Sequence, residues 1–445
     1  MKKVVTRFPP SPTGSLHIGN VRTAIFNYLY ARNVGGSFIV RVEDTDKERS
    51  RREYEDGMKA SVTWLGLAWD NDVVWRQSER TEVYTKYLRA LIDSGHAYLS
   101  QEIEGANREV VRFKNPNKLI TFHDLIRGDV TIDTTDLGDF IIARNITDPV
   151  YHMAVVVDDF EGGVTHVIRG EDHVSNTPRQ ILIQEAIGAP RPTYAHLPLI
   201  VAKDRSKLSK RKHGAAVSLD YYRQKGFLPE GILNYLTLLG WNPGTDQEIF
   251  SLEELIPAFS FDQVQKSSAV FDETKLRWVN REHMLRMTPE AFWEHAEEFL
   301  SEETVTMLDS TGRWRETVSV MRERASTFGD IREADEAGEY RYYYEAPPLK
   351  PEQLLWKDEP ASATKERLER ISGLLEGIPD PWTTDSVKAA VWDYAEKEGR
   401  GQVLWPMRYA LSGKDKSPDP FTIAGIIGRD ETLRRVASAA SLLAA

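Results

Sequence analysis

The chain has 445 residues, a formal net charge of −11 and 0 cysteines. This length exceeds what one hydrophobic core usually holds, so several domains are expected. The lack of cysteine excludes disulfides and thiolate metal sites and suits a reducing, cytoplasmic compartment. We expect neither a signal peptide nor a membrane span, because no apolar run is suitable. An acidic chain binds nucleic acid only where basic residues are concentrated, as they are in residues 203–212.

The first part of the chain alternates between strands and helices. Residues 4–8 are expected to form a strand, residues 21–32 a helix with Asn20 as its N-cap, and residues 37–42 a second strand. This order is that of a βαβ unit, which predicts a parallel sheet. Similar elements are expected at 84–92 (helix), 164–169 (strand), 177–187 (helix) and 196–201 (strand).

Two further regions have a different texture. Short β-like segments at 110–113, 129–132 and 139–143 indicate a small α+β insertion between residues 99 and 150. From residue 221 onward helical spacing dominates. We therefore expect one α/β domain in two halves, 1–98 and 151–220, with the insertion at 99–150 between them. A helical domain is expected at 221–288. An all-helical region is expected at 289–445, with an internal boundary near 346–351.

The loop after the first strand has the composition of an anion site. It contains Pro12-Thr13-Gly14 and leads into His17-Ile18-Gly19-Asn20 at the start of the helix. Backbone N–H groups and the helix dipole attract anions at such a place, and glycine lets a flat ligand approach the backbone. A turn with a surface histidine would give the same pattern.

A basic loop, Lys207-Leu208-Ser209-Lys210-Arg211, follows the last expected strand of the sheet. Two ammonium groups flanking a serine suit a polyphosphate whose charge grows in a transition state. Taken alone, the segment could equally be a solvated surface or a nonspecific RNA patch.

Together the two loops resemble the HIGH and KMSKS signatures of the class I aminoacyl-tRNA synthetases. Other segments are similar to glutamyl-tRNA synthetases of the bacterial type, namely residues 22–29, 38–46, 156–159, 167–172 and 275–278. The resemblance covers nearly the whole chain. It implies a Rossmann-like α/β catalytic domain, an insertion that binds the acceptor end of tRNA, a stem-contact domain at 221–288 and a helical anticodon-binding domain at 289–445.

The resemblance also implies a reaction and its residues. L-Glutamate would be activated with ATP and transferred to tRNA(Glu) in the cytoplasm, with tRNA(Gln) left open as a second substrate and a monomer expected. His17, Asn20, Lys207 and Lys210 are the implied catalytic residues. The implied ATP site consists of Ser11, Thr13, Gly14, His17, Gly19, Asn20, Lys207, Ser209 and Lys210.

The glutamate pocket follows both from chemistry and from the resemblance. A side-chain carboxylate calls for arginine, and Arg7 and Arg169 match the family's residues for this role. Glu43 matches the acceptor of the substrate ammonium, and Tyr151 and Ser11 match its hydroxyl contacts.

Two arginines are expected to read the anticodon. In the helix expected at 314–325, Val318, Met321 and Ala325 share one face, and Arg322 and Arg324 lie off it, free to meet phosphates or base edges. The alternative is that both arginines only solvate a helix face.

The chain departs from the family pattern at some positions. Asn20 replaces the last histidine of HIGH, and Leu208 replaces the methionine of KMSKS. The insertion is short and lacks a cysteine-based zinc site, so no zinc is expected and Mg²⁺ would arrive with ATP. Asp158, Asp159, Glu171 and Asp172 could include a Mg²⁺ ligand, but none is assigned.

The sequence also bears on alternative functions. A glutaminyl-tRNA synthetase is the nearest alternative, although it would carry β-barrel anticodon domains where this chain has helical spacing. A catalytically inactive, tRNA-binding paralogue is disfavoured by the intact His17, Lys207, Lys210, Arg7 and Glu43. No P-loop or dinucleotide fingerprint supports a GTPase or a dehydrogenase.

Overall fold

The structure is a computed structural model that describes residues 3–102 and 109–443, without the side chains of Lys210 and Arg211. The chain divides into two compact units, Met1–Asn280 and Arg281–Ala445. The break falls within helix α10 (Glu273–Arg286). The finer division into catalytic halves, insertion and stem-contact domain stays an expectation.

Two sheets of the first unit position the functional residues. Strands β1 (Val5–Phe8), β2 (Ser37–Val42) and β3 (Trp75–Arg76) form one parallel sheet, in which Arg7 is opposite Ile39. The other sheet has the order β10-β11-β6-β7. Its strands are β6 (Leu119–Asp124), β7 (Gly128–Asp133), β10 (His166–Gly170) and β11 (Thr193–Leu197). The sheets adjoin, because Thr165 N donates to the carbonyl of Val5 at 3.0 Å.

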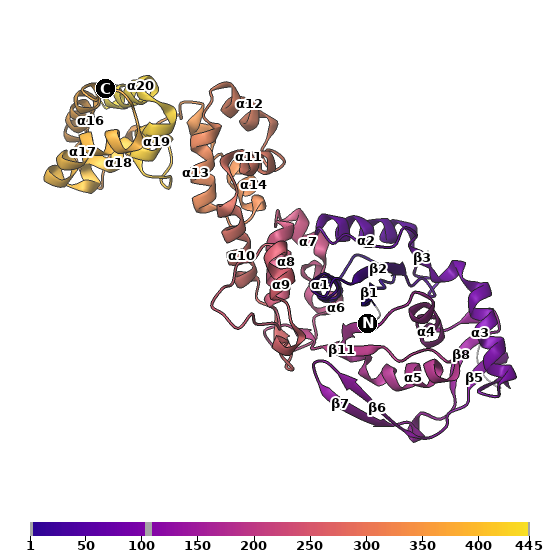
Figure 1. The fold of residues 1–445 in the computed structure, drawn as a ribbon. Helices are drawn as coiled ribbons and strands as arrows, with labels where there is room; N and C mark the ends of the chain where they lie inside the picture. The colour runs from indigo at the N-terminus through magenta and orange to yellow at the C-terminus, as the bar shows by residue number, and fades with distance from the viewer. Residues whose placement is uncertain (1–2, 103–108, 444–445) are drawn as a thin grey trace. The chain divides into compact units, whose positions relative to one another are not determined.

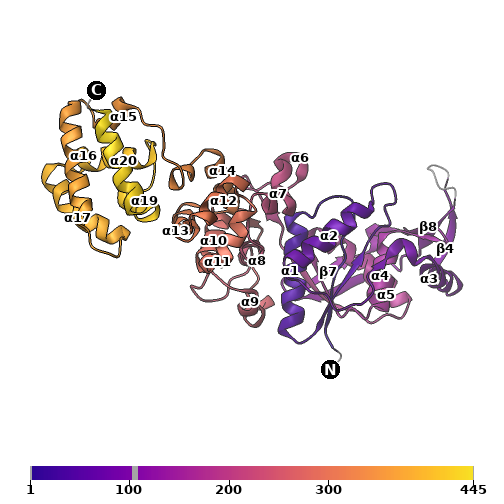
Figure 2. The same ribbon diagram turned by 90° about the horizontal axis from the view of Figure 1, so that it is seen from above.

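Helices cover both faces of these strands. Alternate side chains of a strand point to opposite faces, so Phe38 and Val40 pack with helix α1 (Ile18–Asn33) while Ile39 packs with α4 (Tyr151–Glu161). Figures 1 and 2 show the strands between α1 and the pair α4 and α5 (Thr177–Ala186). The Rossmann-like α/β architecture predicted for this part is confirmed.

The start of α1 differs from the expectation. Its N-cap is His17, not Asn20: His17 has extended backbone angles (φ −78°, ψ 140°), and its Nδ1 accepts from Gly19 N at 3.0 Å. An imidazole nitrogen can accept from the first N–H groups of a helix as Asn or Asp does. Asn20 therefore lies in the first turn, where its side chain lines the cavity described below.

The segment between β4 and α4 contributes to two sheets. Strands β4 (Ala97–Gln101), β5 (Glu109–Phe113), β8 (Phe140–Asn145) and β9 (Asp148–Pro149) form a four-stranded antiparallel sheet. The β6–β7 hairpin instead extends the sheet of β10 and β11 (Figure 1). Its contact with β11 is short: Tyr194 is opposite Asp124, and Leu125 N donates to Tyr194 O at 2.8 Å.

The remaining elements of the first unit are mostly helices. They are α2 (Arg52–Trp64), α3 (Thr81–Asp93), α6 (Lys210–His213), α7 (Leu219–Gln224), α8 (Pro229–Leu238) and α9 (Leu252–Ala258), with the strands β12 (Ile200–Val201) and β13 (Ala269–Val270). Helices α2, α7, α8 and α9 contribute to a core that contains Trp241 and Phe259, and α3 packs in the core that contains α4. Pro198 separates β12 from β11, where one strand was expected.

The described residues of the second unit are helical, as expected. Its helices are α11 (Pro289–Glu297), α12 (Glu302–Ser310), α13 (Trp314–Arg324), α14 (Phe328–Glu336), α15 (Pro351–Leu354), α16 (Ala361–Glu376), α17 (Thr384–Glu398), α18 (Arg400–Ser412), α19 (Pro420–Ile427) and α20 (Arg429–Leu442). The Pro-rich residues 346–351, where an internal boundary was expected, lead into α15, which begins at Pro351.

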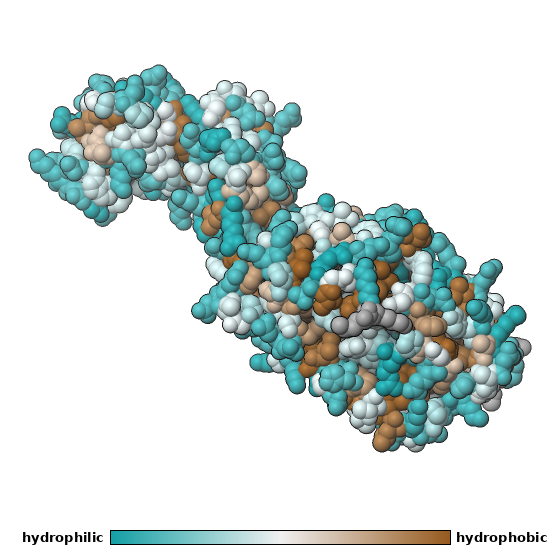
Figure 3. All heavy atoms as spheres, viewed as in Figure 1, coloured by the Kyte–Doolittle hydropathy of each residue, from teal (hydrophilic) through white to brown (hydrophobic). Residues whose placement is uncertain are grey.

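The surface is largely polar. In Figure 3 hydrophilic residues cover most of the viewed face, and apolar residues form small, separate patches. Within residues 3–102 and 109–443, no helix is long and apolar enough to cross a membrane.

Candidate active site

A cavity of about 550 Å³ opens where the strands of the two sheets end. It brings together residues from β1, the α1 N-terminus, β2, α4, β10 and the basic loop. The expected site residues that line it are Arg7, Ser11, Thr13, His17, Gly19, Asn20, Glu43, Tyr151, Arg169, Lys207 and Ser209. Gly14 is not part of this lining, and the side chain of Lys210 lies outside what the structure describes.

The β1 side of the cavity is a buried ion-pair network. The Arg7 Nε lies 3.3 Å from the Asp159 carboxylate, which also pairs with Arg41. Arg41 in turn lies 3.0 Å from Glu43. Burial alone would lower the pKa of Arg41, but Asp159, Glu43 and Asp158 together raise it. Arg7 therefore reaches the cavity with a carboxylate already beside it.

The β10 side differs, because Arg169 has only neutral acceptors. Its guanidinium donates to Gln180 Oε1 at 2.7 Å, to Thr177 Oγ1 at 2.8 Å and to His196 Nε2 at 3.2 Å. In the described part of the chain, no carboxylate forms an ion pair with Arg169, which is 5% exposed. Burial lowers the pKa of Arg169. An anionic ligand would compensate this buried charge.

Glu43 and Tyr151 add a carboxylate and a hydroxyl to the same cavity. Glu43 is 7% exposed; burial raises its pKa and Arg41 opposes the rise. The Tyr151 hydroxyl lies 3.2 Å from His173 Nδ1. Burial, with Arg169 next, lowers the pKa of His173 to about 4, so this ring is neutral near pH 7. Together these groups offer an acceptor for an ammonium beside the arginines.

The loop after β1 and the N-terminus of α1 form a further part of the cavity wall. The Thr13 N–H donates to Ser11 O at 2.8 Å and holds the turn. A Cβ atom at Gly19 would lie only 3.2 Å from His17 Nδ1. Glycine thus leaves the His17 ring room to cap the helix while its edge faces the cavity.

The basic loop lies next to this wall. Lys207 Nζ is 2.9 Å from the Asp172 carboxylate, and both residues line the cavity. Leu208, at the position of the KMSKS methionine, is buried (8% exposed). The loop is thus anchored through Leu208 and presents Lys207 toward the cavity.

Sequence reasoning gave no role to three titratable residues of the lining. Arg22 is 3% exposed and donates to Leu239 O at 2.9 Å and to Pro198 O, and burial lowers its pKa to about 10. Asp172 and His173 were not assigned a role. Helical spacing could have placed Arg22 on the Gly19 face of α1, three residues further along, but arginines at helix starts usually face solvent.

The four acidic residues considered as Mg²⁺ ligands are already engaged. Asp158 accepts from Gln77, Arg80 and Tyr84, and Asp159 pairs with Arg7 and Arg41. Glu171 pairs with Arg127 and accepts from Leu199 N at 2.8 Å, and Asp172 holds Lys207. Among the described residues there is no cluster of three or more side chains suited to a metal ion.

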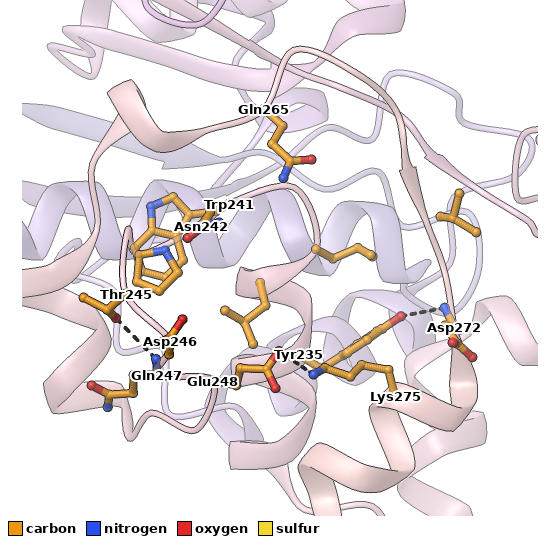
Figure 4. Close-up of a pocket in the computed structure, with 14 residues that line it drawn as sticks. Tyr235, Trp241, Asn242, Thr245, Asp246, Gln247, Glu248, Gln265, Asp272 and Lys275 are labelled. Carbon is orange, nitrogen blue, oxygen red and sulfur yellow. Dashed lines mark hydrogen bonds and ion pairs between the residues drawn. The ribbon is translucent and has the colours of Figure 1, made fainter.

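A second hollow, of about 560 Å³, lies around α8 and α10 (Figure 4). Asp246, Glu248 and Asp272 line it together with a single cation, Lys275, which is 2.5 Å from Glu248. The excess of carboxylates makes it unsuited to a polyphosphate. The nucleotide site is therefore expected in the first cavity.

The two arginines expected at the anticodon differ in the structure. Arg322 is not free, because its guanidinium donates to Leu285 O and, at 2.8 Å, to Met287 O. Leu285 lies in the last turn of α10 and Met287 just after it, where backbone acceptors lack helical partners. Arg324 has a side chain that is 50% exposed, with Glu339 at 3.8 Å.

Comparisons with known proteins agree with this geometry. A model of the class I tRNA synthetase (E and Q) catalytic domain matches residues 3–109 and 100–278, and an anticodon-binding domain model matches residues 291–440. A glutamate–tRNA ligase of Nitratidesulfovibrio vulgaris is 39% identical over 99% of this chain and 100% of the relative. That of Aquifex aeolicus is 40% identical over 98% of each chain.

The chain belongs to the glutamate–tRNA ligase family of class I aminoacyl-tRNA synthetases. A crystal structure of a glutamate tRNA ligase from Elizabethkingia meningosepticum in complex with its amino acid has a TM-score of 0.83 and 30% identity, and covers 99% of this chain and 100% of its own. The predicted family and fold class are thus confirmed, as is the preference for a helical anticodon domain over β-barrels. This family uses ATP.

Proposed function

We propose that this chain is a glutamate–tRNA ligase, which adenylates L-glutamate with ATP and transfers it to the 3′-terminal adenosine of tRNA(Glu). The observation that carries the proposal is Arg169, a buried cation that faces the cavity with only neutral acceptors around it. A substrate with a negatively charged side chain supplies the missing countercharge. Glutamine, with a neutral amide, does not.

The amino acid would be held by groups from both sheets. Arg169 and Arg7 bind the side-chain carboxylate, because a guanidinium can donate two parallel hydrogen bonds to it. Glu43 accepts from the substrate ammonium, and Ser11 and Tyr151 contribute hydroxyl contacts. The α-carboxylate is left directed toward the loop before α1.

ATP would lie against that loop. Ser11, Thr13, Gly14, His17, Gly19 and Asn20 form its cradle at the helix N-terminus, and Lys207, Ser209 and Lys210 approach the phosphates from the basic loop. An oxygen of the glutamate α-carboxylate attacks the α-phosphorus of ATP. The bond between the α-phosphorus and the bridging oxygen of the β-phosphate breaks, and pyrophosphate leaves. The charge that develops on the leaving group is stabilised by His17, Asn20, Lys207 and Lys210. Mg²⁺ accompanies ATP, and no structural zinc is proposed.

In the second step the ribose hydroxyl of the terminal adenosine attacks the mixed anhydride and releases AMP. The second unit would hold the anticodon, with Arg324 as the exposed reader on α13. Charging tRNA(Glu) and tRNA(Gln) transcripts with Arg324→Gln tests this role: a reader changes the ratio of the two efficiencies, and an unchanged ratio removes Arg324 from that role. We further propose a cytoplasmic monomer.

The deciding experiment is ATP–pyrophosphate exchange with glutamate and with glutamine, each with and without tRNA. Exchange that depends on glutamate and on tRNA(Glu) supports the proposal. Exchange with glutamine only would make the chain a glutaminyl-tRNA synthetase, and no exchange with either would indicate an inactive paralogue.

A further inference from the structure

A fully buried histidine lies behind the glutamate-facing arginine. His196, on β11, is 0% exposed and is placed opposite Arg169 of β10 in the parallel register. Its Nε2 lies 3.2 Å from Arg169 Nε, and its Nδ1 lies 2.6 Å from Asp124 Oδ2. The rings of Tyr194 and Phe122 lie beside it, with centroids 6.0 and 6.1 Å away. Neither His196 nor Asp124 lines the cavity.

The bonding partners fix the tautomer of this imidazole. A guanidinium has only donors, so Nε2 of His196 must accept from Arg169. The ring proton is then on Nδ1 and is donated to Asp124. Burial lowers the pKa of His196, although Asp124 opposes the shift. The neutral ring therefore keeps the lone pair of Nε2 directed at the Arg169 Nε–H, with the Thr177 hydroxyl also 3.1 Å from Nε2.

Asp124 is itself held firmly. Its Oδ1 accepts from the N–H groups of Ile126 and Arg127, both at 3.0 Å, and Oδ2 also accepts from the backbone N–H of His196 at 3.0 Å. This carboxylate belongs to the β6–β7 hairpin. The His196 imidazole lies between this carboxylate and Arg169.

We propose that Asp124 and His196 form a positioning pair that fixes the Nε edge of Arg169, so that the Nη1 N–H not bonded to Gln180 meets the substrate side-chain carboxylate. The pair determines glutamate affinity without touching substrate. An aspartate placed directly on Arg169 would satisfy its charge and weaken its attraction for the ligand, as Asp159 does beside Arg7. Inserting a neutral imidazole orients the guanidinium and leaves its charge for glutamate. This inference rests on the proposed function.

Two substitutions of His196 separate positioning from packing. In His196→Gln the amide oxygen can occupy the place of Nε2 and accept from Arg169. In His196→Asn the shorter amide can donate to Asp124 but cannot reach Arg169. We expect His196→Asn to raise KM for glutamate roughly tenfold or more, since a hydrogen bond to a charged group is lost. KM for ATP and kcat at saturating glutamate should change little, and His196→Gln should recover most of the glutamate affinity.

Asp124→Asn provides an independent test of the tautomer. An amide NH₂ facing Nδ1 would favour the tautomer with the proton on Nε2, which points an N–H at an N–H of Arg169. The same rise in KM for glutamate is expected. His166→Asn, a matched control on β10 whose ring bonds to Tyr30 and Thr165, should leave KM for glutamate unchanged.

The measurements are steady-state aminoacylation of tRNA(Glu) together with thermal unfolding of each variant. The proposal is overturned if His196→Asn and His196→Gln behave alike, if KM for ATP rises in parallel, or if both variants lose their folded state. Each of these results would make His196 a packing residue. A wild-type protein that does not activate glutamate would instead contradict the proposed function, so the two failures are distinguishable.

Discussion

The ends of β1 and β10 each place an arginine in the same cavity, but they surround it differently. Arg7 lies beside the carboxylate of Asp159 within a network that also contains Arg41 and Glu43. Arg169 is bonded to an amide, a hydroxyl and an imidazole. Two residues with one predicted role therefore differ in how much charge they have left for a ligand. Arg169 should therefore contribute more than Arg7 to binding of the substrate carboxylate.

The largest expected effect comes from Arg169→Gln. This change removes the buried cation and leaves neutral groups behind, so no anion in the protein is orphaned. KM for glutamate in the aminoacylation assay should rise roughly 100-fold or more, and the preference for glutamate over glutamine should shrink. A rise in KM for glutamate below about threefold would contradict the larger contribution of Arg169 to binding of the substrate carboxylate.

Lys207→Ala should have an effect of similar size on a different parameter. If Lys207 stabilises the departing pyrophosphate, kcat should fall roughly 100-fold while KM for glutamate changes little. Rapid-quench measurement of adenylate formation at several glutamate concentrations separates the rate of the chemical step from glutamate binding. A fall in kcat accompanied by an equal rise in KM for glutamate would mean that the loop only maintains the shape of the cavity.

A smaller change is expected for Arg7→Gln. Asp159 keeps Arg41 as its partner, so the buried carboxylate is not left unpaired. KM for glutamate should rise about tenfold, less than for the Arg169 variant, because the charge of Arg7 is already partly neutralised. Equal effects of the two substitutions in the same assay would show that the surroundings of the arginines do not matter.

The smallest effect concerns a paired carboxylate outside the cavity. Glu55 on α2 is 4% exposed and pairs with Arg76 and Lys59 at 2.8 and 2.6 Å. Burial would raise the pKa of Glu55, but these partners lower it to about 2. The stabilisation is therefore present above the pKa of an unfolded glutamate and is lost as pH falls from about 5 toward 2.

Glu55→Gln should cost about 1–2 kcal/mol at pH 7, less than the full shift, since Arg76 and Lys59 stay partly exposed. Calorimetric Tm differences from wild type should narrow on acidification. Glu53→Gln, at an exposed position of the same helix, is the matched control and should change Tm little at any pH. A Tm difference for Glu55→Gln that does not depend on pH would contradict the ion-pair origin.

The sequence predicted the parallel sheet, the loops at its strand ends and eleven of the residues that line the cavity, because strand periodicity and paired motifs are local signals. It did not predict the buried partners. His196 and Asp124 lie in or at the ends of apolar segments, where a single polar residue gives no indication of what it faces across the sheet. Arg322 was expected to be free, although it stands four residues after Val318 and three before Ala325 and so borders the buried face, where the carbonyls of Leu285 and Met287 accept from it. His17 as N-cap was missed because Asn is the commoner cap.

The β6–β7 hairpin has a consequence for how far this chain could be trimmed. A surface loop that pairs with no other element can be shortened with little loss in the free energy of unfolding. Here β6 pairs with β11 at Asp124 and Tyr194, so excising the hairpin would leave β11 at the margin of the sheet and would free the Tyr194 C=O and the His196 N–H. Such a margin invites self-association, and a shortened enzyme would also lack the carboxylate behind His196. Any minimal version of the catalytic unit must therefore keep residues 119–133.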